Sequence, residues 1–219
     1  MKIYRCKAVA EVQSFYGPLL TDINEETRLA GYLERLAERL WNGIKNKQPA
    51  IFHEISNYHK NYLGSSFGQV MDAPLATADA YATIAFEFGF SGWKEVEKMD
   101  GQTIDLHFET AVNHLLNGRL EQLKTMAKSN KNLLSQNSNF GHKATLLHYT
   151  ASNGVELWRQ QVPSNLPEAV KYLLGEGADK NAKMEVYGGR FDTLALVETS
   201  AHPFDAGLGE EVVEILKTF

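Results

Sequence analysis

The sequence predicts an all-α protein in two parts: a bundle of about four helices in residues 1–103 and stacked helix pairs, an α-solenoid, in residues 104–219. Apolar residues recur every three or four positions over most of the chain, which is the spacing of one helical face. Glycines follow several of these segments, at the position where a left-handed residue commonly ends a helix. Because two short helices cannot bury their apolar faces alone, neighbouring pairs in the second part must stack against one another.

The composition is that of a water-soluble globular protein. The chain has 219 residues, 43% of them hydrophobic, and a formal net charge of -5. It has no apolar run of the roughly 18 residues that a membrane span needs, no signal-peptide segment at its start, and a single cysteine, Cys6. We therefore expect a cytoplasmic protein in a reducing compartment, without disulfides and without a membrane or nucleic-acid partner.

In the first part, the clearest element is a helix from about Ile23 to Lys45. Asp22 is the expected N-cap of this helix, with Glu25 placed as in a capping box. Residues 1–20 have mixed periodicity, so both a strand and a short helix are compatible with them until Gly17-Pro18 interrupts the chain. The apolar stripe of the helix consists of Leu29, Leu33, Leu36, Leu40, Trp41 and Ile44.

Three further helices and a loop are expected before the second part begins. Pro49 suits the first turn of the next helix, which Gly64 would end. Residues 65–74 are rich in Ser and Gly and are expected to form a loop. The remaining elements are a helix over Thr77–Phe88 ended by Gly89, a helix over Gly92–Met99 capped by Ser91, and a linker over residues 100–103.

The helix expected over residues 92–99 is also a candidate recognition helix of a DNA-binding helix-turn-helix. A recognition helix needs a basic face toward the phosphate backbone. Here Lys94 and Lys98 are balanced by Glu95 and Glu97. The sequence therefore predicts no nucleic-acid partner.

The stretch 144–182 organises the second part of the chain. Its first half begins with a suitable N-cap, Thr145, and stops at Gly154. Its second half carries another apolar helical face and stops at Gly177. We expect both glycines to have positive φ, because a left-handed residue ends each helix there. The residues expected to be nearly fully buried are Leu147, Ala151, Leu173 and Leu174.

This stretch resembles the ankyrin repeat, whose signature begins Thr-Pro-Leu-His-x-Ala and ends Leu-Leu-x-x-Gly-Ala-Asp-x-Asn-Ala. The matching segments are Thr145-Leu-Leu-His-Tyr-Thr-Ala151 and Leu173-Leu-Gly-Glu-Gly-Ala-Asp-Lys-Asn-Ala182, with leucine in place of the first proline. The resemblance implies a structural hydrogen bond from His148 across the turn. It also implies non-catalytic binding of another protein through the finger turns and the concave helices.

The resemblance extends more loosely on both sides. Residues 105–137 resemble a degenerate first repeat, because Asn117-Gly118 precedes Asn153-Gly154 by nearly the ankyrin period of about 33 residues. A third unit begins at Thr193, where leucines replace the family's proline and histidine. Residues 78–93 resemble a helical segment that precedes ankyrin repeats in bacterial proteins.

The spacing between the second and third units exceeds one period by about 15 residues, and most of the surplus lies in residues 155–167. Two interpretations of this inserted segment are open. It exposes side chains to a partner, since Trp and Arg are frequent at binding hot spots, or its tryptophan folds back to fill the groove between repeats. The candidate binding residues are Trp158, Arg159 and Gln160 in this segment and Tyr187 and Arg190 in the finger turn over residues 183–192.

No catalytic residue, metal ligand or cofactor is predicted. His53 and His59 stand six residues apart, which places them on different faces of a helix, whereas a zinc site needs a shared face. Gly188-Gly189 lacks the flanking residues of a nucleotide-binding loop. The enzyme alternative would need four side chains to converge on one pocket: His142, His148, His202 and Asp205.

A third class of function, self-association, is suggested by the end of the sequence. The last helix, expected from Glu210 to Phe219, lacks the Gly-Ala closing and the polar capping repeat that protect a terminal repeat. Unless the repeat continues further, the N-terminal segment or another copy of the chain would cover this helix. A homo-oligomer is therefore the structural alternative to a monomeric binder.

Overall fold

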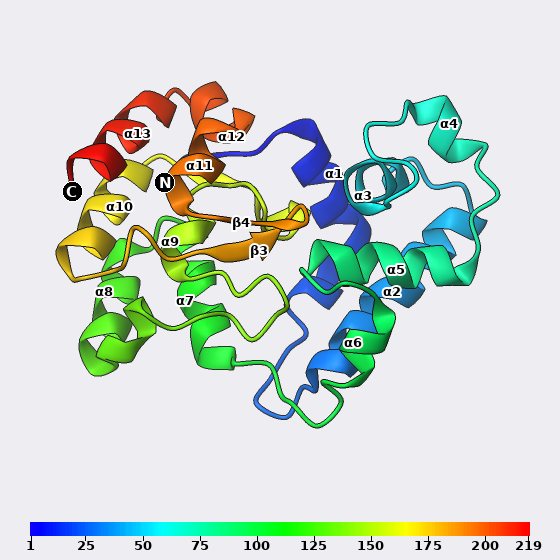
Figure 1. The fold of residues 1–219 in the computed structure, drawn as a ribbon, viewed down its shortest axis with the longest axis horizontal. Helices are drawn as coiled ribbons and strands as arrows, with labels where there is room; N and C mark the ends of the chain where they lie inside the picture. Colours follow the sequence, from blue (N-terminus) through cyan, green and yellow to red (C-terminus); the bar gives the residue numbers. More distant parts are fainter. The chain divides into compact units, whose positions relative to one another are not determined.

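A computed structural model describes residues 1–219 and divides them into two compact units. The N-terminal unit comprises residues 7–104, and the C-terminal unit comprises residues 105–219 together with residues 1–6. The protein is predominantly helical: it has thirteen α-helices and only two sheets, each of two short strands (Figure 1). None of these helices combines the length and the apolar character needed to cross a membrane.

The N-terminal unit is built around the helix α2, Leu29–Lys45. The predicted apolar stripe is confirmed in its first four leucines, which are at most 1% exposed. These leucines belong to the core that α2 shares with α5, whose Ala80 and Ile84 are fully buried. The other helices of the unit are α1 (Lys7–Tyr16), the 3-10 helix η1 (Gly17–Leu20), α3 (Ile51–Tyr58), α4 (Phe67–Met71), α5 (Thr77–Glu87) and α6 (Trp93–Glu97).

Helix α2 begins six residues later than the sequence predicted, and Asp22 is not its N-cap. The backbone just before the helix is held in an extended pairing with the end of the unit. The Leu29 amide donates to the Gln102 carbonyl at 2.8 Å, and the Ile104 amide donates to the Thr27 carbonyl at 2.9 Å. The expected linker over residues 100–103 is therefore partly in this extended pairing. Asp22 forms an ion pair with Arg35 at 2.6 Å instead of capping the helix.

Two other expectations for this unit were wrong. Residues 65–74 are not all loop, because α4 begins after Ser66 in a capping box: the Ser66 amide donates to the Gln69 side chain at 2.8 Å, and the Gln69 amide donates to the Ser66 hydroxyl at 3.4 Å. Ser91 does not cap α6. Its amide instead donates to the Glu95 carboxylate at 2.8 Å, and Gly92 occupies the capping position.

The C-terminal unit packs consecutive helix pairs around one apolar core. The first pair is α7 (Leu106–Leu116) and α8 (Leu120–Ser129), the second is α9 (Leu146–Tyr149) and α10 (Leu166–Gly175), and the third is α11 (Thr193–Glu198) and α13 (Gly209–Thr218). The remaining elements are β1 (Ile3–Tyr4), η2 (Lys131–Leu134), η3 (Leu157–Arg159), β2 (Val162–Pro163), β3 (Met184–Val186), β4 (Gly189–Phe191) and α12 (Ala201–Asp205).

The predictions for the central helix pair are confirmed at the level of backbone and burial. Gly154 has a φ of +74° and Gly177 a φ of +95°. Leu147, Ala151 and Leu173 are fully buried, and Leu174 is 9% exposed. Helix α9 is only four residues long, because the chain turns immediately after it toward the inserted segment.

The N-terminus belongs to the C-terminal unit, which the sequence boundary at residues 103 and 104 did not anticipate. Strand β1 pairs antiparallel with β2, placing Ile3 opposite Pro163 and Tyr4 opposite Val162. The Ser164 amide extends this pairing by donating to the Lys2 carbonyl at 3.0 Å. For residues 1–20, where the sequence was compatible with a strand or a short helix, the structure contains both: the short strand β1 is followed by the helix α1.

Candidate functional site

The β3–β4 hairpin carries the two candidate binding residues of the C-terminal unit that are exposed, Tyr187 and Arg190 (Figure 1). It lies at the position expected for the finger turn. Its strands pair in register, with Val186 opposite Gly189, so only Tyr187 and Gly188 form the turn. Side chains alternate along β3 because successive residues of a strand face opposite sides. Met184 and Val186 are buried against the unit, while Glu185 and Tyr187 are exposed.

The turn is conformationally unusual for its sequence. Tyr187 and Gly188 have φ values of +55° and +74°. Two-residue hairpin turns with positive φ at both positions strongly favour Asn or Gly at the first position, since a larger side chain is strained there. A tyrosine at this position therefore carries a conformational cost that asparagine would largely avoid.

Tyr187 is nevertheless held in a defined orientation. Its hydroxyl donates to Asn153 Oδ1 at 2.7 Å. Asn153 in turn donates through Nδ2 to the Leu196 carbonyl and the Thr199 hydroxyl, both at 3.1 Å. The residue is 60% exposed, whereas burial around the phenol group raises the pKa of Tyr187. The ring is thus anchored at its hydroxyl and open to solvent along its side.

The base of the hairpin is tied to the rest of the unit. The Glu185 amide donates to the His142 carbonyl at 2.7 Å. Lys183 and Asp192 form an ion pair across the hairpin base, and Asp192 Oδ1 also accepts from the Ala195 amide at 2.9 Å, which caps α11. Arg190 is exposed on β4, opposite Glu185.

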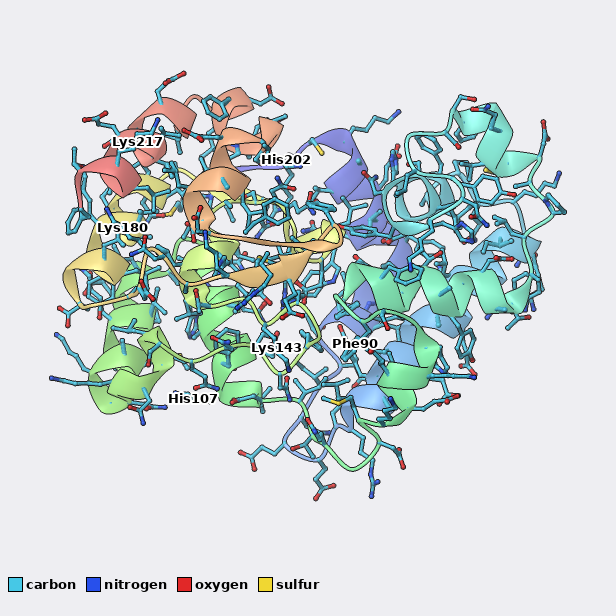
Figure 2. All side chains as sticks on the ribbon, in the orientation of Figure 1. Phe90, His107, Lys143, Lys180, His202 and Lys217 are labelled. Atoms are coloured by element: carbon cyan, nitrogen blue, oxygen red, sulfur yellow. The ribbon has the colours of Figure 1, made fainter.

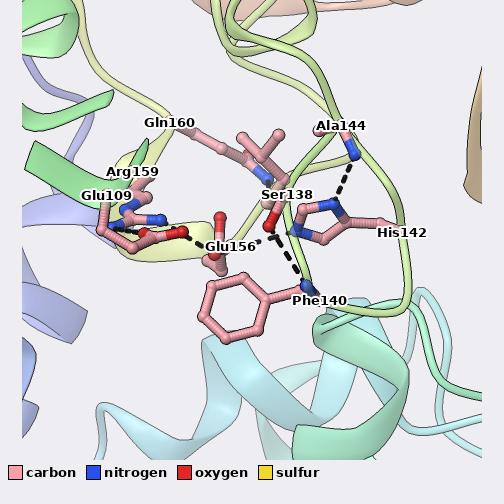
Figure 3. Close-up of polar contacts among 9 residues, drawn as sticks. Glu109, Ser138, Phe140, His142, Ala144, Glu156, Arg159 and Gln160 are labelled. Carbon is pink, nitrogen blue, oxygen red and sulfur yellow. Dashed lines mark hydrogen bonds and ion pairs between the residues drawn. The ribbon is translucent and has the colours of Figure 1, made fainter. Parts of the chain in front are cut away.

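The interior of the same unit contains a buried charge network (Figure 3). Arg159 is its centre: Nη2 lies 2.5 Å from Glu109 Oε2 on α7, and Nη1 donates to Glu156 Oε1 at 3.0 Å. His142 Nε2 lies 3.8 Å from the same oxygen of Glu156, and His142 Nδ1 accepts from the Ala144 amide at 3.0 Å. All four of these side chains are at most 3% exposed. The network therefore links α7 and the inserted segment to the residue that anchors the hairpin.

The pKa values of the two carboxyl groups in the network shift in opposite directions. Burial raises the pKa of Glu109, although Arg159 opposes this shift. Burial acts in the same direction on Glu156, but Arg159 and His142 outweigh it and lower the pKa of Glu156 to about 2. Arg159 favours the ionised form of both carboxylates, with which it forms ion pairs.

The inserted segment does not expose the residues that were expected to bind a partner. Trp158 is 9% exposed, Arg159 3% and Gln160 7%. The Arg159 guanidinium lies over the Trp158 ring, 4.4 Å from its centroid, and Gln160 Nε2 donates to the Val155 carbonyl at 2.8 Å. The interpretation of Trp158 and Arg159 as exposed contact residues is wrong. Their burial agrees with the alternative in which the segment packs into the unit.

Two of the three histidines of the enzyme alternative, His142 and His148, are fully buried. His148 is fully buried, accepts from the Thr145 amide through Nδ1 at 3.0 Å and donates from Nε2 to the Ala182 carbonyl at 3.1 Å. Burial lowers the pKa of His148 to about 4, so the ring is neutral and structural. His202 lies on α12 (Figure 2), where the neighbouring Asp205 accepts from the Tyr4 hydroxyl at 3.1 Å.

His53 and His59, in the N-terminal unit, belong to separate contacts. His53 Nε2 lies 2.7 Å from Glu11, and His59 Nε2 lies 2.9 Å from Asp79. Each histidine thus has its own carboxylate partner. The two rings do not form a shared ligand set.

Comparison with known protein families, with curated proteins and with solved structures finds no match for this chain. The candidate site is therefore defined by geometry alone: an exposed hairpin with Tyr187 and Arg190, joined to a buried charge network by the hydrogen bond from the Glu185 amide to the His142 carbonyl. The sequence named Tyr187 and Arg190, and it named His142 only for the enzyme alternative, whereas it did not identify Glu109 and Glu156, which form the charge network with Arg159. Glu109, His142 and Glu156 come from separate segments, and no local pattern marks them as partners.

Proposed function

We propose that the C-terminal unit is a non-catalytic, ankyrin-type protein-binding unit whose partner contacts the β3–β4 hairpin through Tyr187 and Arg190. The single observation that carries this proposal is Tyr187, which is strained in its backbone, 60% exposed in its side chain and fixed at its hydroxyl. Strained residues that the surrounding structure holds in place are concentrated at functional sites. Tyrosine and arginine are also the residue types that dominate binding hot spots.

A purely structural role accounts poorly for this tyrosine. A typical net contribution of one hydrogen bond to stability is about 1 kcal/mol. The backbone strain of a non-glycine residue with positive φ costs about the same amount, on the order of 1–3 kcal/mol. The bond to Asn153 therefore offsets the strain without a clear surplus, and the ring itself adds little to the core. Contact with a partner supplies the missing contribution.

The geometry also favours a rigid binding surface. The hairpin is fixed by the His142 carbonyl at one strand and by the Lys183–Asp192 ion pair at its base. Ordering a side chain before binding removes an entropy cost of about 0.5–1.5 kcal/mol that association would otherwise include. Glu185 and Arg190 add one charge of each sign beside the ring, which favours a partner surface with polar groups around an apolar contact.

The test is comparative affinity capture with the full chain and with Tyr187→Asn. Asparagine is favoured at this turn position, so the variant should fold at least as well as the parent. We expect the captured partner to bind Tyr187→Asn at least about tenfold more weakly, a loss of about 1.4 kcal/mol. Phe204→Ser serves as the matched control, because Phe204 is an exposed aromatic residue on α12 in the same unit.

Equal capture by the parent and by Tyr187→Asn would contradict the proposed surface. Equal loss with Phe204→Ser would show that general surface hydrophobicity, and not the hairpin, governs the interaction. Thermal denaturation of each variant shows whether a loss of binding merely reflects a loss of folding.

A further inference from the structure

The N-terminal unit contains a pocket of about 150 Å³ between the end of α2, the start of α3, and α4 with the turn that follows it. Its floor is apolar, formed by aliphatic side chains together with one tryptophan and one proline. Two lysines are the only charged residues in the lining. The lining residues are Trp41, Ile44, Lys45, Lys47, Ile51, Val70, Met71, Ala73, Pro74 and Leu75.

The backbone places one of these lysines at the pocket despite a conformational cost. Lys47 has a φ of +50°. It sits in the turn that ends α2, where the Lys47 amide donates to the Ile44 carbonyl at 3.0 Å and the Gln48 amide donates to the Gly43 carbonyl at 2.9 Å. This pair of bonds is the common helix-ending turn whose left-handed position is usually glycine. The turn itself therefore does not require a lysine.

Neither lysine is neutralised by a neighbour. No carboxylate lies within 4.0 Å of the ammonium of Lys45 or Lys47, and none is among the lining residues. Asp72 follows Met71 and precedes Ala73, which both line the pocket, and its own side chain is exposed and outside the lining. The Lys45 ammonium lies 5.6 Å from the centroid of the Trp41 ring, at the edge of the pocket. An apolar floor thus combines with an uncompensated positive rim.

We propose that this pocket binds a small organic acid, with its apolar body on the floor and its carboxylate between Lys45 and Lys47. The size supports this class of ligand, since an apolar cavity of about 150 Å³ can hold a ring as large as benzene. The charge supports it as well, because an ammonium group forms charge-assisted hydrogen bonds with a carboxylate that are stronger than those between neutral groups. A neutral or cationic ligand of the same shape would leave the positive rim without a partner.

The proposal is tested by titrating phenylacetate into the full chain and following the indole N–H signal of Trp41 by NMR, assigned with Trp41→Phe. We expect saturable binding that shifts the Trp41 signal and leaves those of Trp93 and Trp158 in place. Phenylacetamide, the neutral analogue, should bind several-fold more weakly. Benzylamine should not bind, because its charge has the sign of the rim.

Lys47→Gly is the decisive variant, since it removes the ammonium while placing the preferred residue in the turn. We expect an equal or higher melting temperature and an affinity for phenylacetate that is about three- to fivefold lower, the effect of one exposed ion pair. Lys45→Gln should weaken binding to a similar extent. Lys94→Gln, which removes an exposed lysine from α6 of the same unit, should leave the affinity unchanged.

Three outcomes would overturn the proposal. One is the absence of a saturable shift of the Trp41 signal. Another is binding of phenylacetamide as tight as that of phenylacetate. The third is an affinity that Lys47→Gly and Lys45→Gln leave intact. Because the pocket and the hairpin lie in different units, none of these results bears on the protein-binding proposal.

Discussion

At the scale of single residues, the chain places ionisable side chains where water does not reach them. Glu54 on α3 is fully buried, and Glu87 on α5 is 2% exposed. The two carboxyl groups interact directly through a side-chain hydrogen bond, and both act electrostatically on the buried Tyr16 hydroxyl. The nearby Arg39 donates a hydrogen bond from Nε to the Phe15 carbonyl at 2.8 Å. Two neighbouring buried carboxyl groups of this kind are stable only while a proton is retained.

This arrangement predicts an alkaline loss of stability. Burial raises the pKa of Glu54 to about 8, and its hydrogen bond with Glu87 opposes that rise only in part. The unfolded chain releases the Glu54 proton near its ordinary pKa of about 4.3, whereas the folded chain retains it. The free energy of unfolding should therefore fall by about 1.4 kcal/mol per pH unit between these two values.

Glu54→Gln provides the comparison, because glutamine keeps the shape without the titration. Urea unfolding of the parent and the variant at several pH values measures the difference between them. The free energy of unfolding of the variant should increase steadily relative to that of the parent as the pH rises from about 5 to about 8. A difference that does not change with pH would show that Glu54 is ionised in the folded protein. His148, whose pKa is lowered to about 4, is common to both proteins and cancels.

At the scale of elements, the inserted segment is held by an ion pair to helix α7 and by ion pairs within the segment and to His142. Arg159 in η3 reaches Glu109 on α7, and Glu156 reaches back toward His142. The same segment donates from Gln161 Nε2 to the Leu116 carbonyl at the end of α7, at 3.0 Å. The segment is therefore part of the interior of the unit, and it connects the first helix pair to the hairpin.

Arg159→Met is expected to destabilise the C-terminal unit by about 3–5 kcal/mol, because it leaves buried carboxylates without their cation. Urea unfolding measures this loss. Adding Glu109→Gln and Glu156→Gln should recover much of it, since an apolar or neutral replacement of a whole buried ion cluster is often tolerated. If Arg159→Met alone were as stable as the parent, the network would contribute nothing to the fold. Arg190→Met, at an exposed position, is the control.

At the scale of the whole molecule, the chain leaves the C-terminal unit after residue 6, forms the N-terminal unit and returns at residue 105. The first residues are tied at several points. Tyr4 donates to Asp205, and Arg5 Nε donates to Gln161 Oε1 at 2.6 Å. A Cβ atom built at Gly118 would collide with the Met1 sulfur, so Met1 packs closely on that turn.

Removal of residues 1–5 should therefore loosen the C-terminal unit locally. The Ser164 amide loses the Lys2 carbonyl as its acceptor, and its hydrogen exchange should become at least about tenfold faster, a change of about 1.4 kcal/mol in opening free energy. The Leu173 amide, inside α10, should keep its protection. Unchanged exchange at Ser164 would show that β1 does not protect β2 in solution.

Much of the fold was predictable from the sequence because its signals are local. The leucine stripe of α2, the helix over residues 77–87 and the glycine ends at Gly154 and Gly177 each follow from residues within a few positions of one another. Periodicity and helix-ending conformations act over one or two turns, so a single stretch of sequence contains the whole cause. The turn that carries Tyr187 and Arg190 was predicted in the same way, while contact of these two residues with a partner stays a prediction.

Tertiary structure alone decided the features whose cause lies far along the chain. Trp158 and Arg159 have the composition of a binding loop, but Glu109, on another helix, draws Arg159 inward and buries the segment. The start of α2 was displaced because residues 102–104 hold the preceding backbone extended. Strand β1 exists only because Val162 and Pro163 provide its partner. A strand or a buried charge needs a partner to compensate its polar groups, and that partner is fixed only when distant segments meet.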